Sequence, residues 1–238
     1  MDKYSLNARI YPMAIFLFPI IVIGVSYSIQ FDSSLQALSS LGVSTALIYL
    51  LSNLGRDKGK LKEPQLWRDW GGAPTSQMLS LLNNYINPNT KSRYHQKLGI
   101  LCPIDVKLNH EFEREHPDES IDIYKAWTNY LISQTRDSNK FSLVFKENIS
   151  YGFRRNLWGL KSLAISLILI SFLGSSFYHF FKLGFENFKE YPIEFFISET
   201  VLLILLFLWV FVINKNWIKI PAFAYSERLL ETIEMIDS

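Results

Sequence analysis

Four stretches of this chain lack acidic and basic side chains, and this feature restricts the possible folds more than any other. The stretches free of Asp, Glu, Lys and Arg are residues 10–31, 33–55, 162–181 and 200–214. Because a helix needs about 20 apolar residues to cross the hydrocarbon core of a bilayer, each stretch predicts a membrane-spanning helix. The last stretch reaches this length when the apolar residues just before it are included. The predicted spans lie near residues 11–29, 35–54, 160–181 and 196–213.

The composition excludes several other classes of protein. Hydrophobic residues make up 49% of the 238 residues, which is too many for a disordered chain. Cys102 is the only cysteine, so the chain has no internal disulfide and no cysteine-rich zinc site. The net charge of +2 argues against a surface that coats nucleic acid wholesale. A cleaved signal peptide fits the first stretch poorly, because Pro12 and Pro19 interrupt a long apolar run that has no clear cleavage site.

Basic residues gather on one side of the predicted spans. Lys3 and Arg9 precede the first span, and basic residues recur between Arg56 and Lys62 after the second. The two loops on the opposite side hold more acidic than basic residues. Cytoplasmic loops of membrane proteins carry an excess of Lys and Arg, so both termini and the middle segment are predicted to be cytoplasmic.

The fold class that follows is an all-α membrane protein, with four transmembrane helices in two hairpins and a mostly helical cytoplasmic domain inserted between them. The predicted parts are a first hairpin at 1–54, a cytoplasmic domain at 55–157, a second hairpin at 158–213 and an amphipathic tail helix at 214–238. Thr75 and Thr90 are the predicted N-caps of two helices in the middle domain, and the tail is amphipathic from Pro221 onward. The tail is expected to pack on the middle domain or to contact another subunit.

Signals for catalysis are weak, and we predict no catalytic residue, no cofactor and no metal site. The glycines of the segment 55–60 stand one residue too close for a phosphate-binding loop, and Leu61 occupies the place of the expected Ser or Thr. The segment 110–116 holds two histidines and three glutamates, but not at the one-turn spacing of a zinc protease. We interpret it as a solvated acidic helix face.

Two segments of the middle domain combine aromatic, basic and glycine residues. The candidate ligand-binding residues in them are Trp67, Arg68, Trp70, Gly71, Gly72, Thr75, Lys91, Arg93, Tyr94, His95 and Lys97. Cations hold phosphates and aromatic faces stack on bases, so these segments are typical of a site for single-stranded nucleic acid. The alternative is that Trp67, Trp70 and Tyr94 belong to the core and that the basic residues meet anionic lipid.

The second predicted span is the most polar of the four. Its candidate pore-lining residues are Ser40, Ser44, Ile48 and Ser52, although small polar residues also let helices pack closely. Arg154 and Arg155 directly precede the third span and are the candidate link between the middle domain and the membrane. Glu199, near one end of the fourth span, is costly in lipid and is expected to face a vestibule or a partner.

This layout, with the segments 66–75 and 90–95 inserted between two pairs of spans, resembles the transmembrane effectors of bacterial antiphage operons. In particular, the chain resembles the channel subunit of the Hailong systems. The resemblance implies a tetrameric channel in the bacterial inner membrane, encoded beside a nucleotidyltransferase. It also implies a cytoplasmic crown that binds an oligodeoxyadenylate signal, which holds the channel shut until its loss opens the pore and kills the infected cell.

Three functions are therefore compared below. The first is a ligand-gated channel in which a polyanion bridges Arg68, Arg93 and Lys97 from several subunits. The second is a membrane-bound enzyme acting on lipid or nucleotide through His95, His110 or His116 and nearby carboxylates. The third is a membrane scaffold that holds a soluble partner.

Overall fold

The computed structural model describes residues 3–30 and 34–236, and every regular element in these ranges is helical. The prediction of an all-α protein is confirmed for this part of the chain. The chain divides into two compact units. The first consists of residues Met1–Lys62 and Gly152–Ile218, and the second of Glu63–Tyr151 and Lys219–Ser238. The boundaries fall inside three helices rather than in loops.

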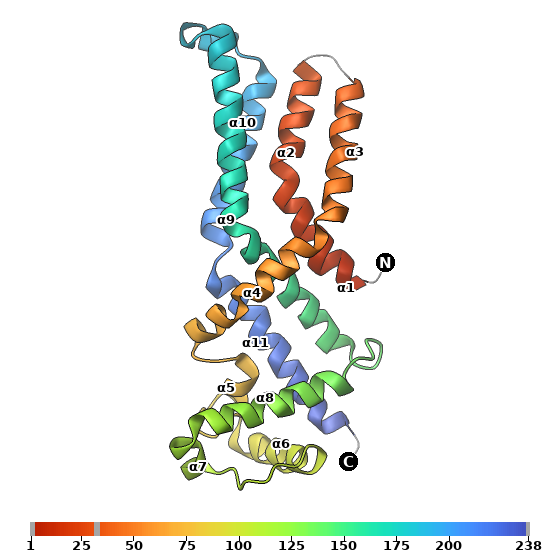
Figure 1. Cartoon of the computed structure of the whole chain (residues 1–238), viewed down its shortest axis with the longest axis vertical. Helices are drawn as coiled ribbons and strands as arrows, with labels where there is room; N and C mark the ends of the chain where they lie inside the picture. The colour runs from red at the N-terminus through yellow and green to blue at the C-terminus, as the bar shows by residue number, and fades with distance from the viewer. Residues whose placement is uncertain (1–2, 31–33, 237–238) are drawn as a thin grey trace. The chain divides into compact units, whose positions relative to one another are not determined.

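The first unit, here called the membrane unit, holds the apolar helices (Figure 1). Its elements are α1 (Lys3–Ser5), the π-helical η1 (Leu6–Ile10), α2 (Tyr11–Gln30), α3 (Ser34–Leu50), the start of α4 (Ser52–Trp70), most of α9 (Ser142–Leu183), the 3-10 helix η2 (Phe185–Glu190), α10 (Ile193–Phe207), the π-helical η3 (Leu208–Val212) and the start of α11 (Lys215–Glu231). Helix α2 packs against both α3 and α10.

Three helices of this unit are long and apolar enough to cross a membrane. They cover Lys3–Gln30, Ser142–Leu183 and Ile193–Val212, and they contain the first, third and fourth predicted spans almost entirely. The second predicted span is different. Helix α3 has 17 residues, and a turn at Leu51 separates it from α4, so the predicted span 35–54 is not one helix. A count of four spans in two hairpins therefore remains a prediction.

Glycines in α4 and α9 meet at a close crossing within the membrane unit. A Cβ added to Gly159 would lie 2.8 Å from the Cα of Gly59, and one added to Gly59 would lie 2.6 Å from the Oδ1 of Asn156. The Asn156 amide is itself fixed, because it donates to the Ala8 carbonyl at 2.6 Å. The glycine pair that superficially suggested a phosphate loop, Gly55 and Gly59, is helical and faces α9, which is the packing use of a G-x-x-x-G spacing.

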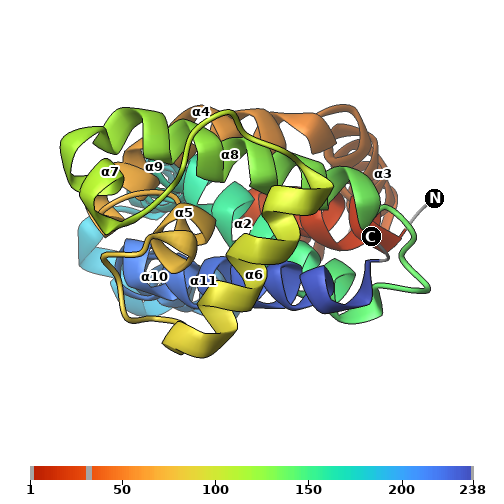
Figure 2. The same cartoon turned by 90° about the horizontal axis from the view of Figure 1, so that it is seen from below.

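The second unit, called the sensor unit after the role that the sequence predicts for it, is built from short helices (Figure 2). Its elements are the end of α4, α5 (Pro74–Leu79), α6 (Pro88–Leu101), α7 (His110–Glu115), α8 (Pro117–Gln134), the start of α9, the end of α11 and the 3-10 helix η4 (Thr232–Met235). Helix α8 contacts both α5 and α7, and α6 crosses it (Figure 2).

The core of the sensor unit gathers apolar side chains from most of these helices. Its completely buried members include Leu66, Met78, Leu79, Leu98, Trp127, Leu131, Leu229, Leu230 and Ile233. The indole N–H of Trp127 donates to the Cys102 carbonyl at 3.1 Å, so this large side chain is buried with its polar atom satisfied. The last three residues belong to the tail, whose 3-10 helix η4 contacts α6.

The structure corrects two predicted helix starts. Helix α5 has Ala73 rather than Thr75 at its N-cap, and α6 begins at Pro88 with Asn87 as its cap. In both helices proline occupies the first position, where its missing N–H costs nothing, so the cap lies before the proline. The tail helix α11 begins at Lys215, close to the predicted start at residue 214, and Pro221 lies inside it.

Candidate ligand-binding pocket

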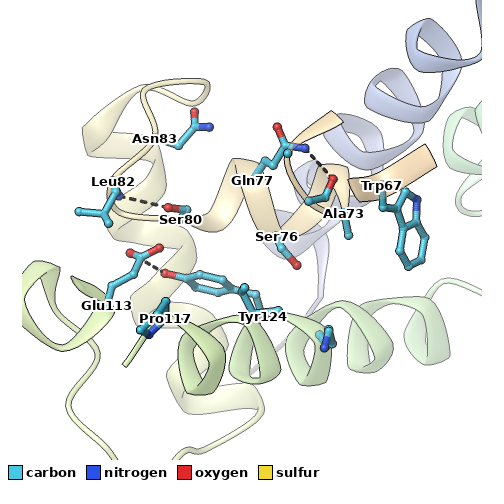
Figure 3. Close-up of a pocket in the computed structure, with 14 residues that line it drawn as sticks. Trp67, Ala73, Ser76, Gln77, Ser80, Leu82, Asn83, Glu113, Pro117 and Tyr124 are labelled. Carbon is cyan, nitrogen blue, oxygen red and sulfur yellow. Dashed lines mark hydrogen bonds between the residues drawn. The ribbon is translucent and has the colours of Figure 1, made fainter. Parts of the chain in front are cut away.

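A pocket of about 330 Å³ opens within the sensor unit, between the end of α4, α5 and α8 (Figure 3). Its lining residues are Trp67, Gly71, Gly72, Ala73, Ser76, Gln77, Ser80, Leu82, Asn83, Glu113, Pro117, Ile121, Tyr124 and Lys125. The volume lies at the lower end of the range for small-molecule sites. Three of the sequence-predicted ligand residues, Trp67, Gly71 and Gly72, are thus part of one concave surface.

The two glycines end α4 and shape one wall of the pocket. Gly71 and Gly72 have φ angles of +87° and +128°, which side chains with a Cβ rarely adopt. The Gly72 N–H donates to the Trp67 carbonyl at 2.7 Å and closes the last turn of the helix. The Gln77 amide then donates to the carbonyl of Gly72 at 2.6 Å, which fixes this wall against α5. The two glycines thus form an unusual turn directly after α4.

A buried carboxylate forms the opposite end of the pocket. Glu113 is 7% exposed, and its Oε2 accepts from the Leu81 N–H at 2.8 Å and from the Tyr124 hydroxyl at 3.0 Å. Figure 3 shows the Glu113 and Tyr124 side chains pointing toward each other. Burial, together with the adjacent Glu113 charge, raises the pKa of Tyr124 well above its ordinary value, so this phenol stays a hydrogen-bond donor.

A buried lysine holds the same loop from its other side. The ammonium of Lys91 donates to the Ser80 carbonyl at 2.5 Å and to the Asn83 carbonyl. Burial lowers the pKa of Lys91, and the negative charge of Glu113 opposes this shift. The loop at residues 80–83 is therefore bound through its carbonyls by a cation and through its Leu81 N–H by an anion. Lys91 positions the pocket rim and does not line the pocket.

His95 supports the floor beneath this site. Its Nε2 lies 2.7 Å from the Leu79 carbonyl, and because a carbonyl only accepts, Nε2 carries the proton. Its ring contacts Tyr124 and Trp127 edge-on, with ring centroids 5.9 Å and 5.2 Å apart. Burial lowers the pKa of His95, and the hydrogen bond to Leu79 only partly offsets this effect. At neutral pH His95 is an uncharged structural residue.

The open part of the pocket offers aromatic and hydrogen-bonding surface with little charge. The half-buried Trp67 ring lies at one end, and Leu82 and Asn83 lie toward the other (Figure 3). The Ser76 hydroxyl is buried and has no hydrogen-bond partner among the described residues. Lys125 is the cation among the lining residues, and it pairs with Asp122 at 2.8 Å. A flat, uncharged group with polar edges suits these walls.

The remaining predicted ligand residues do not line this pocket. Arg68 is exposed at the end of α4, and Lys97 is half-buried on α6. Trp70 and Tyr94 are buried, as in the alternative interpretation, and Thr75 is buried in α5. Arg93 is exposed and pairs with Glu234 at 3.3 Å.

The predicted pore-lining residues differ in how deeply they are buried within the membrane unit. Ser44 is only 2% exposed within a single chain, while Ile48 and Ser52 are half-buried, and the Ser40 side chain lies outside the described residues. Burial of Ser44 favours the packing use of these small residues.

The two arginines before the third predicted span make contacts within the membrane unit. Arg154 donates to the Trp217 carbonyl at 2.8 Å, and its guanidinium lies 4.7 Å from the centre of the Trp217 ring. Arg155 is buried beside Asn156. Both residues therefore stabilise the junction of α9 with its surroundings, and any role in gating acts through this packing.

Sequence reasoning missed the central acidic residue. The 110–116 segment was interpreted as a solvated acidic face, and this is wrong for Glu113, although Glu111 and Glu115 are exposed. No sequence signal separates Glu113 from its neighbours, because the separation depends on which face of the short α7 meets α8. Within the described ranges, no cluster of three or more His, Cys, Asp or Glu side chains is placed to hold a metal ion.

Comparisons of the chain with protein family models, with curated proteins and with solved structures gave no match.

Proposed function

We propose that the chain is the subunit of a ligand-gated membrane channel that acts as an effector in bacterial antiphage defence. In this proposal the sensor unit binds a short single-stranded DNA or nucleotide signal that keeps the pore closed. The observation that carries the ligand class is the pocket at Trp67, in which an aromatic ring, an unpaired Ser76 hydroxyl and the Glu113–Tyr124 pair surround one cavity.

These walls match a nucleobase better than a phosphate chain. A base presents a flat face for stacking and a polar edge for hydrogen bonding. A buried carboxylate disfavours phosphate at the same point and favours the amino groups of a base edge. The phosphates of a bound strand would instead meet exposed cations outside the pocket, of which Arg68 is the closest in sequence to the Trp67 wall.

The connectivity supports coupling of this pocket to the membrane. Trp67 lies in the last turn of α4 and Gly71 directly follows this helix, and a single residue separates the start of α4 at Ser52 from the end of α3. A ligand biases a pore only by binding its closed and open states with different affinity. We propose that a ligand orders the end of α4, and that this ordering makes the ligand's affinity for the closed state differ from its affinity for the open state.

The remaining parts of the proposal come from the chain's layout. In this proposal four spans form two hairpins and leave both termini and the sensor unit in the cytoplasm, where an intracellular signal can reach the pocket. A homo-oligomer, tetrameric by the resemblance to Hailong channels, supplies the pore that one chain does not enclose. A nucleotidyltransferase from the same operon would make the signal.

Ion flux from liposomes that contain the purified full-length protein tests the proposal. We expect flux without nucleic acid, and suppression of that flux by short single-stranded oligonucleotides or by deoxynucleotides. Homopolymers of each base, tested separately, identify the preferred one. If folded and inserted protein gives no flux under any of these conditions, the channel proposal fails, and the scaffold and enzyme alternatives take its place.

Binding to the pocket is tested separately, by fluorescence anisotropy of a labelled oligonucleotide with the protein in detergent. Trp67→Ala removes the stacking surface and is expected to weaken binding about 5-fold to 150-fold, because one base–aromatic stack is worth about 1–3 kcal/mol. Ile100→Ala is the matched control, since Ile100 is 68% exposed on α6 of the same unit. Equal affinity of the two variants would remove the pocket from the ligand site.

A further inference from the structure

Another cavity, of about 360 Å³, opens in the membrane unit along the line where α2 and α10 pack together (Figure 1). Its α2 wall extends from Phe18 to Ile29, and its α10 wall from Glu194 to Val201. Phe18 and Ile29 are exposed, whereas Val25 between them is half-buried, so the cavity is a groove with an open side. Neither the sensor unit nor α3, which carries most of the candidate pore residues, lines this groove. The proposed channel function therefore does not use it.

The walls of the groove are apolar, because the serine hydroxyls in them are already hydrogen-bonded to backbone. The Ser26 hydroxyl donates to the Glu194 carbonyl at 3.0 Å, which ties α2 to α10 at one end of the groove. The Ser198 hydroxyl donates to the Phe195 carbonyl at 2.9 Å. Apart from Glu194, the remaining lining residues are Phe, Ile and Val. Such walls offer nothing to replace the hydration of a polar solute, so the groove suits a hydrocarbon chain.

The length of the groove matches one leaflet of a bilayer. Its α2 wall covers the eleven residue steps from Phe18 to Ile29, which is about 16 Å of helix at about 1.5 Å per residue. Half of the hydrocarbon core of a bilayer measures about 15 Å. Ile29 is the last residue but one of α2, and Glu194 is the second residue of α10, so one end of the groove lies at the ends of both helices. A chain in the groove would run as lipid tails do, from the interface toward the centre of the bilayer.

Glu194 places a negative charge at this end of the groove. Its side chain is half-buried, and within the described ranges its carboxylate forms no ion pair. A carboxylate binds a protonated amine through a charge-assisted hydrogen bond, whereas it repels a phosphate. The charge therefore favours a phospholipid whose head group carries an amine over an anionic phospholipid without one.

We propose that the groove between α2 and α10 binds one acyl chain of a phospholipid with an amine-bearing head group, and that Glu194 holds the amine. The chain fills space that the side chains of the two helices leave open. Helices in a bilayer associate mainly through van der Waals packing and hydrogen bonds, because lipid tails are as apolar as the side chains. A chain ordered in the groove adds such contacts to both helices and so stabilises their packing.

Native mass spectrometry of the full-length protein in detergent tests this inference, with phosphatidylethanolamine and phosphatidylglycerol of equal chain length added in turn. We expect the wild type to bind the ethanolamine lipid more tightly than the glycerol lipid. Val25→Trp places a large ring in the groove and is expected to remove one bound ethanolamine lipid per chain. Leu203→Trp is the matched control and should retain that lipid, since Leu203 is 52% exposed on α10 and does not line the groove.

The role of Glu194 is tested by its conservative variant. Glu194→Gln is expected to keep the bound lipid but to reduce the preference for ethanolamine over glycerol lipid by about 1.5-fold to 5-fold, the range expected for a partly exposed ion pair. Glu190→Gln should leave the preference unchanged, because Glu190 is exposed in η2. An unchanged preference in Glu194→Gln would remove the amine contact.

Photolabelling of the wild type keeps the test decisive if Val25→Trp does not fold. An ethanolamine lipid with a diazirine in the middle of its acyl chain should label residues 18–29 and 194–201 more strongly than the exposed Ile170 of α9. Label spread evenly over the exposed apolar residues would overturn the inference, and so would a groove left unlabelled because a second copy of the chain covers it. Equal lipid binding by Val25→Trp and Leu203→Trp would also overturn it. Because no readout uses flux or oligonucleotide, failure of this inference is distinguishable from failure of the channel proposal.

Discussion

Substitution of Gly159 by alanine tests the close crossing of α4 and α9 inside the membrane unit. The new Cβ would lie 2.8 Å from the Cα of Gly59 and 2.8 Å from the carbonyl carbon of Lys58. Both atoms belong to backbone, so the clash cannot be relieved by a side-chain rotation. Two helices must move apart instead, and overpacking of this kind costs about 1–3 kcal/mol.

A second glycine of the same helix isolates this cost. A Cβ at Gly174 would meet nothing within 4 Å, so Gly174→Ala gains only the helix propensity of alanine, about 1 kcal/mol. Gly159→Ala gains the same propensity but adds the clash. The difference between the two variants therefore equals the steric cost, about 1–3 kcal/mol, with Gly159→Ala the less stable.

Thermal unfolding of both variants in the same detergent measures this difference. For a chain of this size about 1 kcal/mol corresponds to about 2–4 °C in Tm. Gly55→Ala adds a graded check, because its Cβ would meet the flexible Leu160 side chain at 3.0 Å and is expected to cost less than Gly159→Ala. A Gly159→Ala variant that melts at or above the Gly174→Ala temperature would refute the crossing.

Three further predictions concern the sensor unit. Glu113→Ala leaves two hydrogen-bond donors and the nearby Lys91 charge uncompensated, and is expected to cost about 3 kcal/mol in thermal unfolding, against less than about 0.5 kcal/mol for the exposed Glu111→Ala. Burial lowers the pKa of His95, so the folded state binds protons less readily than the unfolded state. The free energy of unfolding is therefore expected to fall as the pH drops below about 6.5. His95→Gln should reduce this fall, and an unchanged pH profile of the variant would contradict the prediction. Arg68→Ala and Arg93→Ala each test a phosphate contact: the slope of log K against log salt for oligonucleotide binding should decrease by about 0.7 per lost contact, and an unchanged slope removes that residue from the DNA path.

The membrane character of the chain could be predicted without a structure, because a bilayer acts as a solvent on each segment separately. Charge-free stretches of sufficient length indicate spanning helices wherever they occur, and three helices of the described chain have this property. The importance of Gly71 and Gly72 could also be recognised from the sequence, because glycine adopts positive φ angles at little cost.

The roles of individual polar residues were decided by tertiary packing. Lys91 and Arg93 are both basic and only two positions apart on α6, yet the first is buried on backbone carbonyls and the second is exposed. Glu113 is buried although the charged residues Glu111 and Glu115 nearby are exposed, and Glu199 and His179 are each buried on an apolar helix. Local sequence determines where a residue lies on its helix, but which face of that helix is covered depends on segments distant in the chain. Burial is therefore determined only in the folded protein, and the charge and binding capacity of a polar side chain depend on that burial.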